Sequence, residues 1–177
     1  MKKCLTTLHL VSGYLLIALF FSANVSLARG TYQTNDEFLA QSFEQSIPAP
    51  KMVWLTGDRK QTVKNILNHD YPNLRIRYWQ NAAISAWILD EIGKEHPITV
   101  GIVVKDGAIQ QIRVLAFRES RGDEIRHAFF TRQFEQLSLT DNDQLNQKID
   151  GISGATLSVR AMQRLATLAL FLDSETR

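Results

Sequence analysis

The chain has 177 residues, of which 45% are hydrophobic and 21% charged, and its formal net charge is +2 at pH 7. This length suits one ordinary domain with its own core, and the near-neutral charge excludes the basic footprint of a nucleic-acid-binding protein. The only cysteine is Cys4, which excludes an intramolecular disulfide, a thiolate-bound iron–sulfur cluster and c-type haem attachment. His69, His96 and His127 have no partner at helical spacing, so no metal site is expected.

A basic start and a long apolar run mark the N-terminus. Lys2 and Lys3 precede an apolar run over residues 8–25, and Ser26-Leu27-Ala28 places small residues at both positions that a signal peptidase reads. This pattern predicts a signal peptide over residues 1–28, cleaved after Ala28, and hence a periplasmic protein. The alternative is an uncleaved membrane anchor, because the run approaches the length of a spanning helix. The cleaved chain would contain no cysteine, so redox work would need an organic cofactor.

Residues 31–97 predict two helices and three strands. A helix is expected after Thr34 and before the break at Pro48, with one apolar face formed by Phe38, Leu39 and Phe43. A second helix is expected from about Arg59 to Asn68. Short apolar or alternating runs predict strands at residues 52–55, 74–79 and 86–90.

The clearest local structure is a hairpin. Residues 98–104 and 108–117 are rich in β-branched and apolar residues, and Lys105-Asp106-Gly107 between them supplies a turn that tolerates positive φ. The loop Arg118-Glu119-Ser120-Arg121-Gly122 follows. A helix is then predicted from Asp123 to about Leu137, before a polar loop over residues 140–148. Its apolar side chains are expected in the core: Ile125, Phe129, Phe130 and Phe134.

The most informative segment is Asp150-Gly151-Ile152-Ser153-Gly154-Ala155-Thr156-Leu157-Ser158. It precedes an apolar-periodic stretch over residues 157–172, which predicts a long final helix. A turn of small residues that opens a helix leaves backbone N–H groups free at a positive dipole end, and such a site suits a phosphate. The simpler alternative is an ordinary helix start in which the Ser153 side chain is the cap.

Two segments resemble the FMN-binding domain family. Asp150, Ser153, Gly154, Ala155 and Thr156 match, in order, its flavinylation motif Asp-x-x-Ser/Thr-Gly-Ala-Thr. The hairpin and the loop after it are similar to a second family segment, in which Glu-Thr-Pro-Gly follows two strands; Ser120 and Arg121 replace the Thr and the Pro. Over roughly residues 98–172, the chain resembles small periplasmic members of the family and is similar to the covalent-flavin subunits of the Rnf complex and of the sodium-pumping NADH:quinone oxidoreductase; residues 31–97 are not explained by this resemblance.

The resemblance implies an α+β fold, with a curved, largely antiparallel sheet packed by helices and the motif opening the last helix. It divides the chain into a signal peptide (1–28), an N-terminal extension (29–97) and an FMN-binding domain (98–177). It also implies that FMN is bound covalently through a phosphoester on Thr156, and that Asp150 helps to hold the FAD donor or its metal. The implied cofactor-binding residues are Asp150, Gly151, Ser153, Gly154, Ala155, Thr156, Glu119, Ser120, Arg121 and Gly122.

The function implied is periplasmic electron transfer, with two expected partners: an exported Mg-dependent flavin transferase and a membrane-bound redox protein. A redox carrier is expected rather than a stand-alone enzyme, and no catalytic residue is assigned. Two alternatives stay open: a flavin-dependent reductase of a small substrate or metal chelate, and a non-catalytic FMN-binding interaction module. The reductase would need a substrate pocket beside the flavin ring, which residues 31–97 could build.

Several other side chains carry two interpretations. Arg118 or Arg121 could stabilise negative charge on reduced flavin, or could form only a surface pair with Glu119. The aromatic residues of the predicted strands could stack on the flavin but more often form core; they are Trp54, Tyr78, Trp79 and Trp87. Acidic residues without a nucleophile or a metal ligand nearby are expected at solvated helix ends; they are Asp90, Glu91, Glu95, Asp123 and Glu124.

Overall fold

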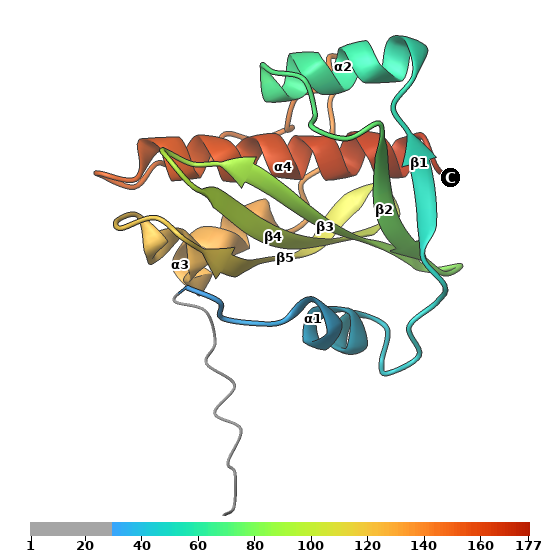
Figure 1. Ribbon diagram of the computed structural model, residues 1–177, viewed down its shortest axis with the longest axis horizontal. Coiled ribbons are helices and arrows are strands. Elements are labelled where there is room, and N and C mark those ends of the chain that lie inside the picture. Colours follow the sequence, from blue (N-terminus) through green and yellow to red (C-terminus); the bar gives the residue numbers. More distant parts are fainter. Residues whose placement is uncertain (1–29) are drawn as a thin grey trace, which may run out of the picture.

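The computed structural model describes residues 30–177 and shows an α+β fold built on one open sheet (Figure 1). All neighbouring strands are antiparallel, in the order β1-β2-β3-β4-β5. The strands are β1 (Lys51–Trp54), β2 (Arg75–Gln80), β3 (Ile84–Ile92), β4 (Pro97–Lys105) and β5 (Ala108–Phe117). The predicted fold class is confirmed, whereas the predicted signal peptide lies outside the described residues.

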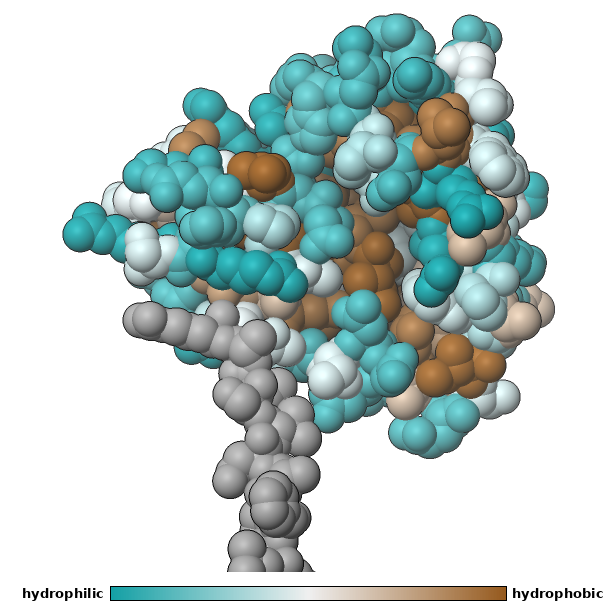
Figure 2. Space-filling model, in the orientation of Figure 1, coloured by the Kyte–Doolittle hydropathy of each residue, from teal (hydrophilic) through white to brown (hydrophobic). Residues whose placement is uncertain are grey.

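Helices cover both faces of the sheet. The α-helices are α1 (Asn35–Ser42), α2 (Gly57–Leu67), α3 (Ala128–Thr131) and α4 (Thr156–Ser174), and short 3₁₀ helices form η1 (Asp123–Arg126) and η2 (Arg132–Phe134). In Figure 1, α4 lies along one face with α2 outside it, and α1 lies against the other face. The surface of α2 that Figure 2 shows is hydrophilic, as its exposed residues Lys60, Gln61 and Lys64 require. None of the helices in residues 30–177 is long and apolar enough to cross a bilayer.

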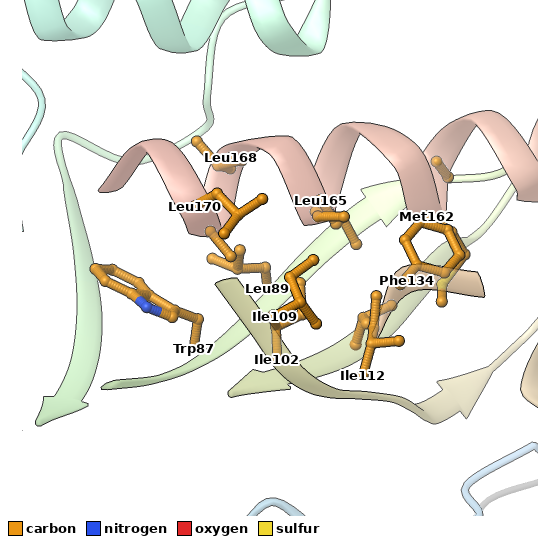
Figure 3. Close-up of a cluster of buried hydrophobic side chains, with 14 of the residues drawn as sticks. Trp87, Leu89, Ile102, Ile109, Ile112, Phe134, Met162, Leu165, Leu168 and Leu170 are labelled. Atoms are coloured by element: carbon orange, nitrogen blue, oxygen red, sulfur yellow. The ribbon is translucent and has the colours of Figure 1, made fainter. Parts of the chain in front are cut away.

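The main core lies between α4 and the sheet. Met162, Leu165 and Leu168 of α4 are fully buried and meet the side chains of β3, β4 and β5 (Figure 3), namely Leu89, Ile102, Ile109 and Ile112. A second, smaller core lies under α1. There Gly101 allows the Phe38 ring to approach β4, since a Cβ atom at position 101 would lie 2.7 Å from that ring. Strand β4 therefore packs against core on both faces, which explains why residues 98–104 are all buried.

Two segments pair with the outer edge of β5. The N–H groups of Tyr32 and Gln33 donate to the Leu115 carbonyl at 2.8 and 3.2 Å. At the other end of the strand, Ile109 exchanges two hydrogen bonds of 2.8 Å with residues 136 and 137. These pairings protect an edge that would otherwise expose its backbone groups.

Most of the predicted elements are confirmed, with boundaries shifted by one or two residues, except that α1 ends at Ser42, well before the predicted break at Pro48. Thr34 caps α1 through a reciprocal pair of hydrogen bonds with Glu37. The hairpin turn places Asp106 and Gly107 at φ values of 52° and 79°. The final helix begins at Thr156, directly at the end of the flavinylation motif.

The continuous helix predicted over residues 123–137 is wrong. The chain forms η1, α3 and η2 in succession, and the backbone is extended at His127 (ψ 150°) and Glu135 (ψ 134°). These breaks let Ile125, Phe130 and Phe134 all reach the core while the chain turns to pair with Ile109. The prediction that Phe129 is a core residue is also wrong, because its side chain is 63% exposed. Here tertiary packing overrides the helical pattern.

Candidate functional site

The flavinylation motif forms an exposed turn that leads into α4. Gly154 has a φ of 82°, and the N–H of Ala155 donates to the Ile152 carbonyl at 3.0 Å. A Cβ atom added at Gly151 or Gly154 would meet no atom within 4 Å, so the turn is open to solvent. Thr156 is the first helical residue and is itself exposed. The turn therefore leaves Thr156 accessible from solvent.

The start of α4 has no side-chain cap. Ala155 occupies the cap position, so the alternative in which the Ser153 side chain caps the helix is wrong. The first helical hydrogen bond runs from the Val159 N–H to the Ala155 carbonyl at 2.9 Å, and the N–H groups of residues 156–158 donate to no acceptor within the described chain. Free N–H groups at a positive dipole end fit a phosphate.

The structure brings the two sequence segments together. Gly122, at the end of the loop after β5, has a φ of 92° and packs against the start of α4. A Cβ atom there would lie 3.0 Å from the Ser158 hydroxyl oxygen and 3.3 Å from the Ala155 Cβ. On the other side of the motif, the Asp150 N–H donates to the Gln133 side chain at 2.7 Å, while the Asp150 carboxylate is exposed. The helix start is thus held by the chain that follows β5.

The Glu119 carboxylate binds the turn between β3 and β4 and does not pair with an arginine. Its Oε1 accepts from the backbone N–H groups of Lys94, Glu95 and His96 at 2.6, 2.7 and 2.9 Å. Burial alone would raise the pKa of Glu119, but these three hydrogen bonds outweigh that effect and lower the pKa below its ordinary value. The surface-pair alternative for this loop is therefore wrong: within the described residues Glu119 forms no ion pair.

The two arginines of the loop differ in their surroundings. The Arg118 guanidinium donates from Nη1 to the Pro97 carbonyl and to the Thr99 hydroxyl, both at 3.0 Å. Arg121 is exposed, and no acceptor for it lies among residues 30–177. Ser120 lines an open cleft of about 590 Å³ together with Tyr32, His96, Arg118 and Glu119. The role of Arg118 and Arg121 in flavin redox chemistry stays a prediction.

A larger groove of about 720 Å³ runs beside α4, between that helix, α2 and the loop over residues 142–149. From Ser158 to Asp173, every residue of α4 is buried except four, and all four line the groove: Arg160, Gln163, Arg164 and Thr167. Sequence reasoning missed this site. The signal was present as polar residues at i, i+3, i+4 and i+7 in an otherwise apolar helix.

Glu91 is a buried carboxylate at the border of this groove. Its side chain is 2% exposed, and its oxygens lie 3.0 Å from His69 Nε2 and 3.1 Å from Arg164 Nη1. The expectation of a solvated helix end is therefore wrong for Glu91, which lies in β3 and is paired.

Tyr71 is a neighbouring titratable group. Burial first, and then the carboxylates of Asp90 and Glu91, raise the pKa of its hydroxyl to about 12.

The strand aromatics mostly serve the core. Trp87 is fully buried and stacks on Tyr78, with ring centroids 4.7 Å apart and planes 9° from parallel. Trp54 is 53% exposed and lies beside Arg75, whose guanidinium carbon is 5.6 Å from the indole centroid. The core interpretation is confirmed for Trp87 and Tyr78, and neither lines the groove beside α4.

Comparison with known proteins agrees with this geometry. Residues 93–170 match the model of the FMN-binding domain family. The matched region contains β4, β5, the loop at Gly122, the flavinylation motif and most of α4, so it spans both segments that meet at the start of α4. The match supports the FMN-binding domain family and flavin binding. No curated protein matches the chain significantly.

Proposed function

We propose that this protein is a periplasmic electron carrier that holds FMN covalently through a phosphoester on Thr156. The observation that carries the proposal is the exposed Thr156 at an uncapped helix N-terminus, inside a region that matches the FMN-binding domain. When bound, FMN supplies the electron-transfer chemistry, and the protein supplies attachment and orientation.

The residues around Thr156 fit a phosphate. The N–H groups of the first turn of α4 are free within the described chain, and the helix dipole favours negative charge at this end. Gly154 at positive φ brings the backbone around without a side chain in the way. Gly122, in the loop after β5, packs on Ala155 and Ser158 and so helps to fix the start of α4. Arg121 directly precedes Gly122 and is exposed, and we propose that its cation contributes to holding the attached phosphate.

The attachment needs an exported flavin transferase. A threonine hydroxyl does not attack a phosphate unaided at neutral pH, so a base on the transferase must take its proton. The Thr156 oxygen would form the new bond to the phosphorus of the FMN half of FAD, and AMP would leave. Asp150 is exposed five residues before Ala155 in the same open turn, where its carboxylate is available to the metal-bound donor.

Covalent attachment suits an exported protein. A chain that crosses the membrane unfolded cannot bring a loosely held cofactor with it, and an ester bond removes later dissociation. The signal peptide over residues 1–28 and a membrane-bound redox partner belong to this proposal. The near-neutral charge of the chain gives no preference for an acidic or a basic partner.

Intact-protein mass spectrometry tests the proposal in a host that contains the transferase. We expect a mature chain that begins at Arg29 and carries one FMN. Thr156→Ala should abolish the adduct while leaving the protein folded, and Thr156→Ser should keep it because the hydroxyl remains. An FMN adduct on another hydroxyl of Thr156→Ala would refute the assignment. Membrane-bound protein that still begins at Met1 would show that residues 1–28 form an uncleaved membrane anchor. Oxidation of the reduced protein by small substrates would favour the reductase alternative.

A further inference from the structure

The outer part of the sheet has one side that faces solvent. Toward α4, β1 and β2 bury Val53, Ile76 and Tyr78 in the core. On the other side, α1 packs against β3 and β4, and β1 forms the sheet edge beyond it (Figure 1). Because side chains alternate along a strand, this leaves five residues wholly or partly at the surface: Met52, Trp54, Arg75, Arg77 and Trp79. Together they form the β1–β2 face.

β1 lacks the polar outer side that a half-buried strand usually has. Met52 is 37% exposed and Trp54 is 53% exposed. Each lies directly opposite an exposed arginine of β2, Met52 opposite Arg77 and Trp54 opposite Arg75. The Arg75 guanidinium carbon lies 5.6 Å from the centre of the Trp54 ring, a cation–π pair that stabilises the two strands locally. This pair accounts for neither the exposed Met52 nor Arg77.

The β1–β2 face is positively charged. Neither Arg75 nor Arg77 forms an ion pair with any described residue. No aspartate or glutamate occurs in residues 45–57 or 71–89, the two segments that contain β1 and β2. This face therefore favours an anionic ligand or surface.

A hollow of about 340 Å³ lies beside the two arginines. Apolar side chains line it together with Arg75 and Arg77; they are Met52, Trp79 and Ile88. The one carboxylate of the lining is Asp90, which accepts from the Thr99 hydroxyl at 2.6 Å. Guanidinium groups form paired hydrogen bonds with phosphate, so the hollow suits an amphiphile with a phosphate head and an apolar body.

We infer that the β1–β2 face binds anionic phospholipid and places the protein on a membrane surface. Tryptophan and arginine side chains are favoured at the level of lipid headgroups, and anionic lipids attract clustered cations. A specific protein interface takes about 20–30 residues a side, far more than this face offers, whereas a few such side chains suffice at a bilayer. The inference does not rest on the proposed function, because neither FMN nor Thr156 takes part in lipid binding.

Vesicle sedimentation tests the inference. The chain from Arg29 onward is used, because it contains every described element with its core and lacks the apolar run over residues 8–25, which would bind lipid by itself. We expect several-fold more binding to vesicles of phosphatidylglycerol and phosphatidylcholine than to phosphatidylcholine alone. Salt at about 1 M, where the Debye length is about 3 Å, should release the protein.

Paired arginine variants locate the binding surface. Arg75→Gln combined with Arg77→Gln should weaken binding to anionic vesicles more than about tenfold, since each arginine near such a surface contributes roughly fivefold. Arg113→Gln combined with Arg132→Gln is the matched control. It removes the same charge from exposed arginines on and after β5, at the opposite edge of the sheet, and should leave most of the binding intact.

Tryptophan fluorescence gives a second measurement. Trp54 is exposed, whereas Trp79 is partly buried and Trp87 is buried. Emission should therefore shift to shorter wavelengths on anionic vesicles, and Trp54→Phe should remove much of this shift. Trp54→Ala should weaken binding several-fold, whereas Phe129→Ala, which removes a ring that is 63% exposed on α3, should not. Circular dichroism of each variant reports folding.

Absence of binding to anionic vesicles would overturn the inference. Equal losses in the two double arginine variants would also overturn it, because overall charge and not a defined face would then attract the lipid. Neither result bears on the proposed function, since the adduct on Thr156 is measured separately by mass. Binding by protein without FMN that is lost in the Arg75 and Arg77 double variant supports the inference, whether or not Thr156 carries the cofactor.

Discussion

Thr156 and Ser158 are two hydroxyl residues in the first turn of α4, and the fold distinguishes them. Thr156 is exposed, whereas Ser158 is 5% exposed and faces Gly122. Sequence spacing alone leaves both hydroxyls near the motif, and only their burial shows that a transferase could reach one and not the other. Two carboxylates near the motif also differ in their surroundings. The Glu119 carboxylate accepts three backbone N–H groups, while the Asp150 carboxylate is exposed in the open turn.

We predict that Asp150→Ala accumulates as folded protein without flavin. Only the backbone N–H of Asp150 is held, by Gln133, so loss of the carboxylate should change the melting temperature little. Mass spectrometry of the exported protein measures the loading. Asp141→Ala is the matched control, since Asp141 is another exposed aspartate in the preceding loop. Normal flavin incorporation in Asp150→Ala would show that this carboxylate has no part in attachment.

Glu119 gives a different prediction, because its role in the structure is local. Glu119→Ala removes the acceptor of three N–H groups and should cost about 1–2 kcal/mol in the free energy of unfolding, since water replaces it only partly. The pKa of Glu119 is lowered, so its contribution is full above the ordinary value of 4.5 and is lost as the pH falls through the lowered pKa. Denaturant titrations at neutral and acidic pH measure both effects. Equal stability losses at both pH values would contradict this account.

At the scale of elements, local patterns predicted the structure wherever the determining contacts are local. The turn at Asp106 and Gly107 joins neighbouring strands, and the Thr34 cap lies three residues from its partner Glu37. The segment after Gly122 behaves differently. Its helical pattern is interrupted because the chain must bury Phe134 and also pair with Ile109. The local sequence carries no signal for this pairing with a distant strand. The groove beside α4 was missed for the same reason, because α2 closes it from a distant part of the chain.

The contact between the loop after β5 and α4 gives a prediction for Gly122→Ala. Positive φ costs roughly 1–2 kcal/mol for a residue with a side chain, and the added Cβ atom would also press on Ser158 at 3.0 Å. We expect a loss of roughly 2–3 kcal/mol in the free energy of unfolding. Gly107→Ala separates the two causes, because Gly107 has a φ of 79° but no atom within 4 Å of an added Cβ. Equal losses in urea titrations of both variants would mean that the contact with α4 contributes nothing.

At the scale of the whole molecule, the region that matches the FMN-binding domain does not complete its own structure. It begins at residue 93, yet β1, β2 and β3, which all lie before it, complete the sheet on which α4 packs. Ser85 of β3 donates to the buried Asp173 near the end of α4 at 2.5 Å, and Arg59 of α2 pairs with Glu175 at 2.9 Å. The sequence contained the motif and the hairpin that resemble the family, but the role of residues 31–97 stayed open. In the structure these residues hold α4 in place and form one wall of its groove.

The cluster of His69, Glu91 and Arg164 joins the end of α2, β3 and α4, and it makes this packing sensitive to pH. The Asp70 carbonyl raises the pKa of His69 above its ordinary value of 6.5, burial opposes this effect, and Glu91 adds to it. Because the pKa is higher in the folded protein, the stabilisation by His69 is full below pH 6.5 and is lost as the pH rises through the raised pKa.

His69→Gln should therefore lower the melting temperature at about pH 5.5 and much less at about pH 8.5. The difference should be no more than a few degrees, because the His69 side chain is 45% exposed and solvent screens the pair. His127→Gln is the control, since His127 is exposed on another part of the surface. Thermal melts that show the same loss for His69→Gln at both pH values would mean that shape, and not charge, makes His69 fit beside Glu91.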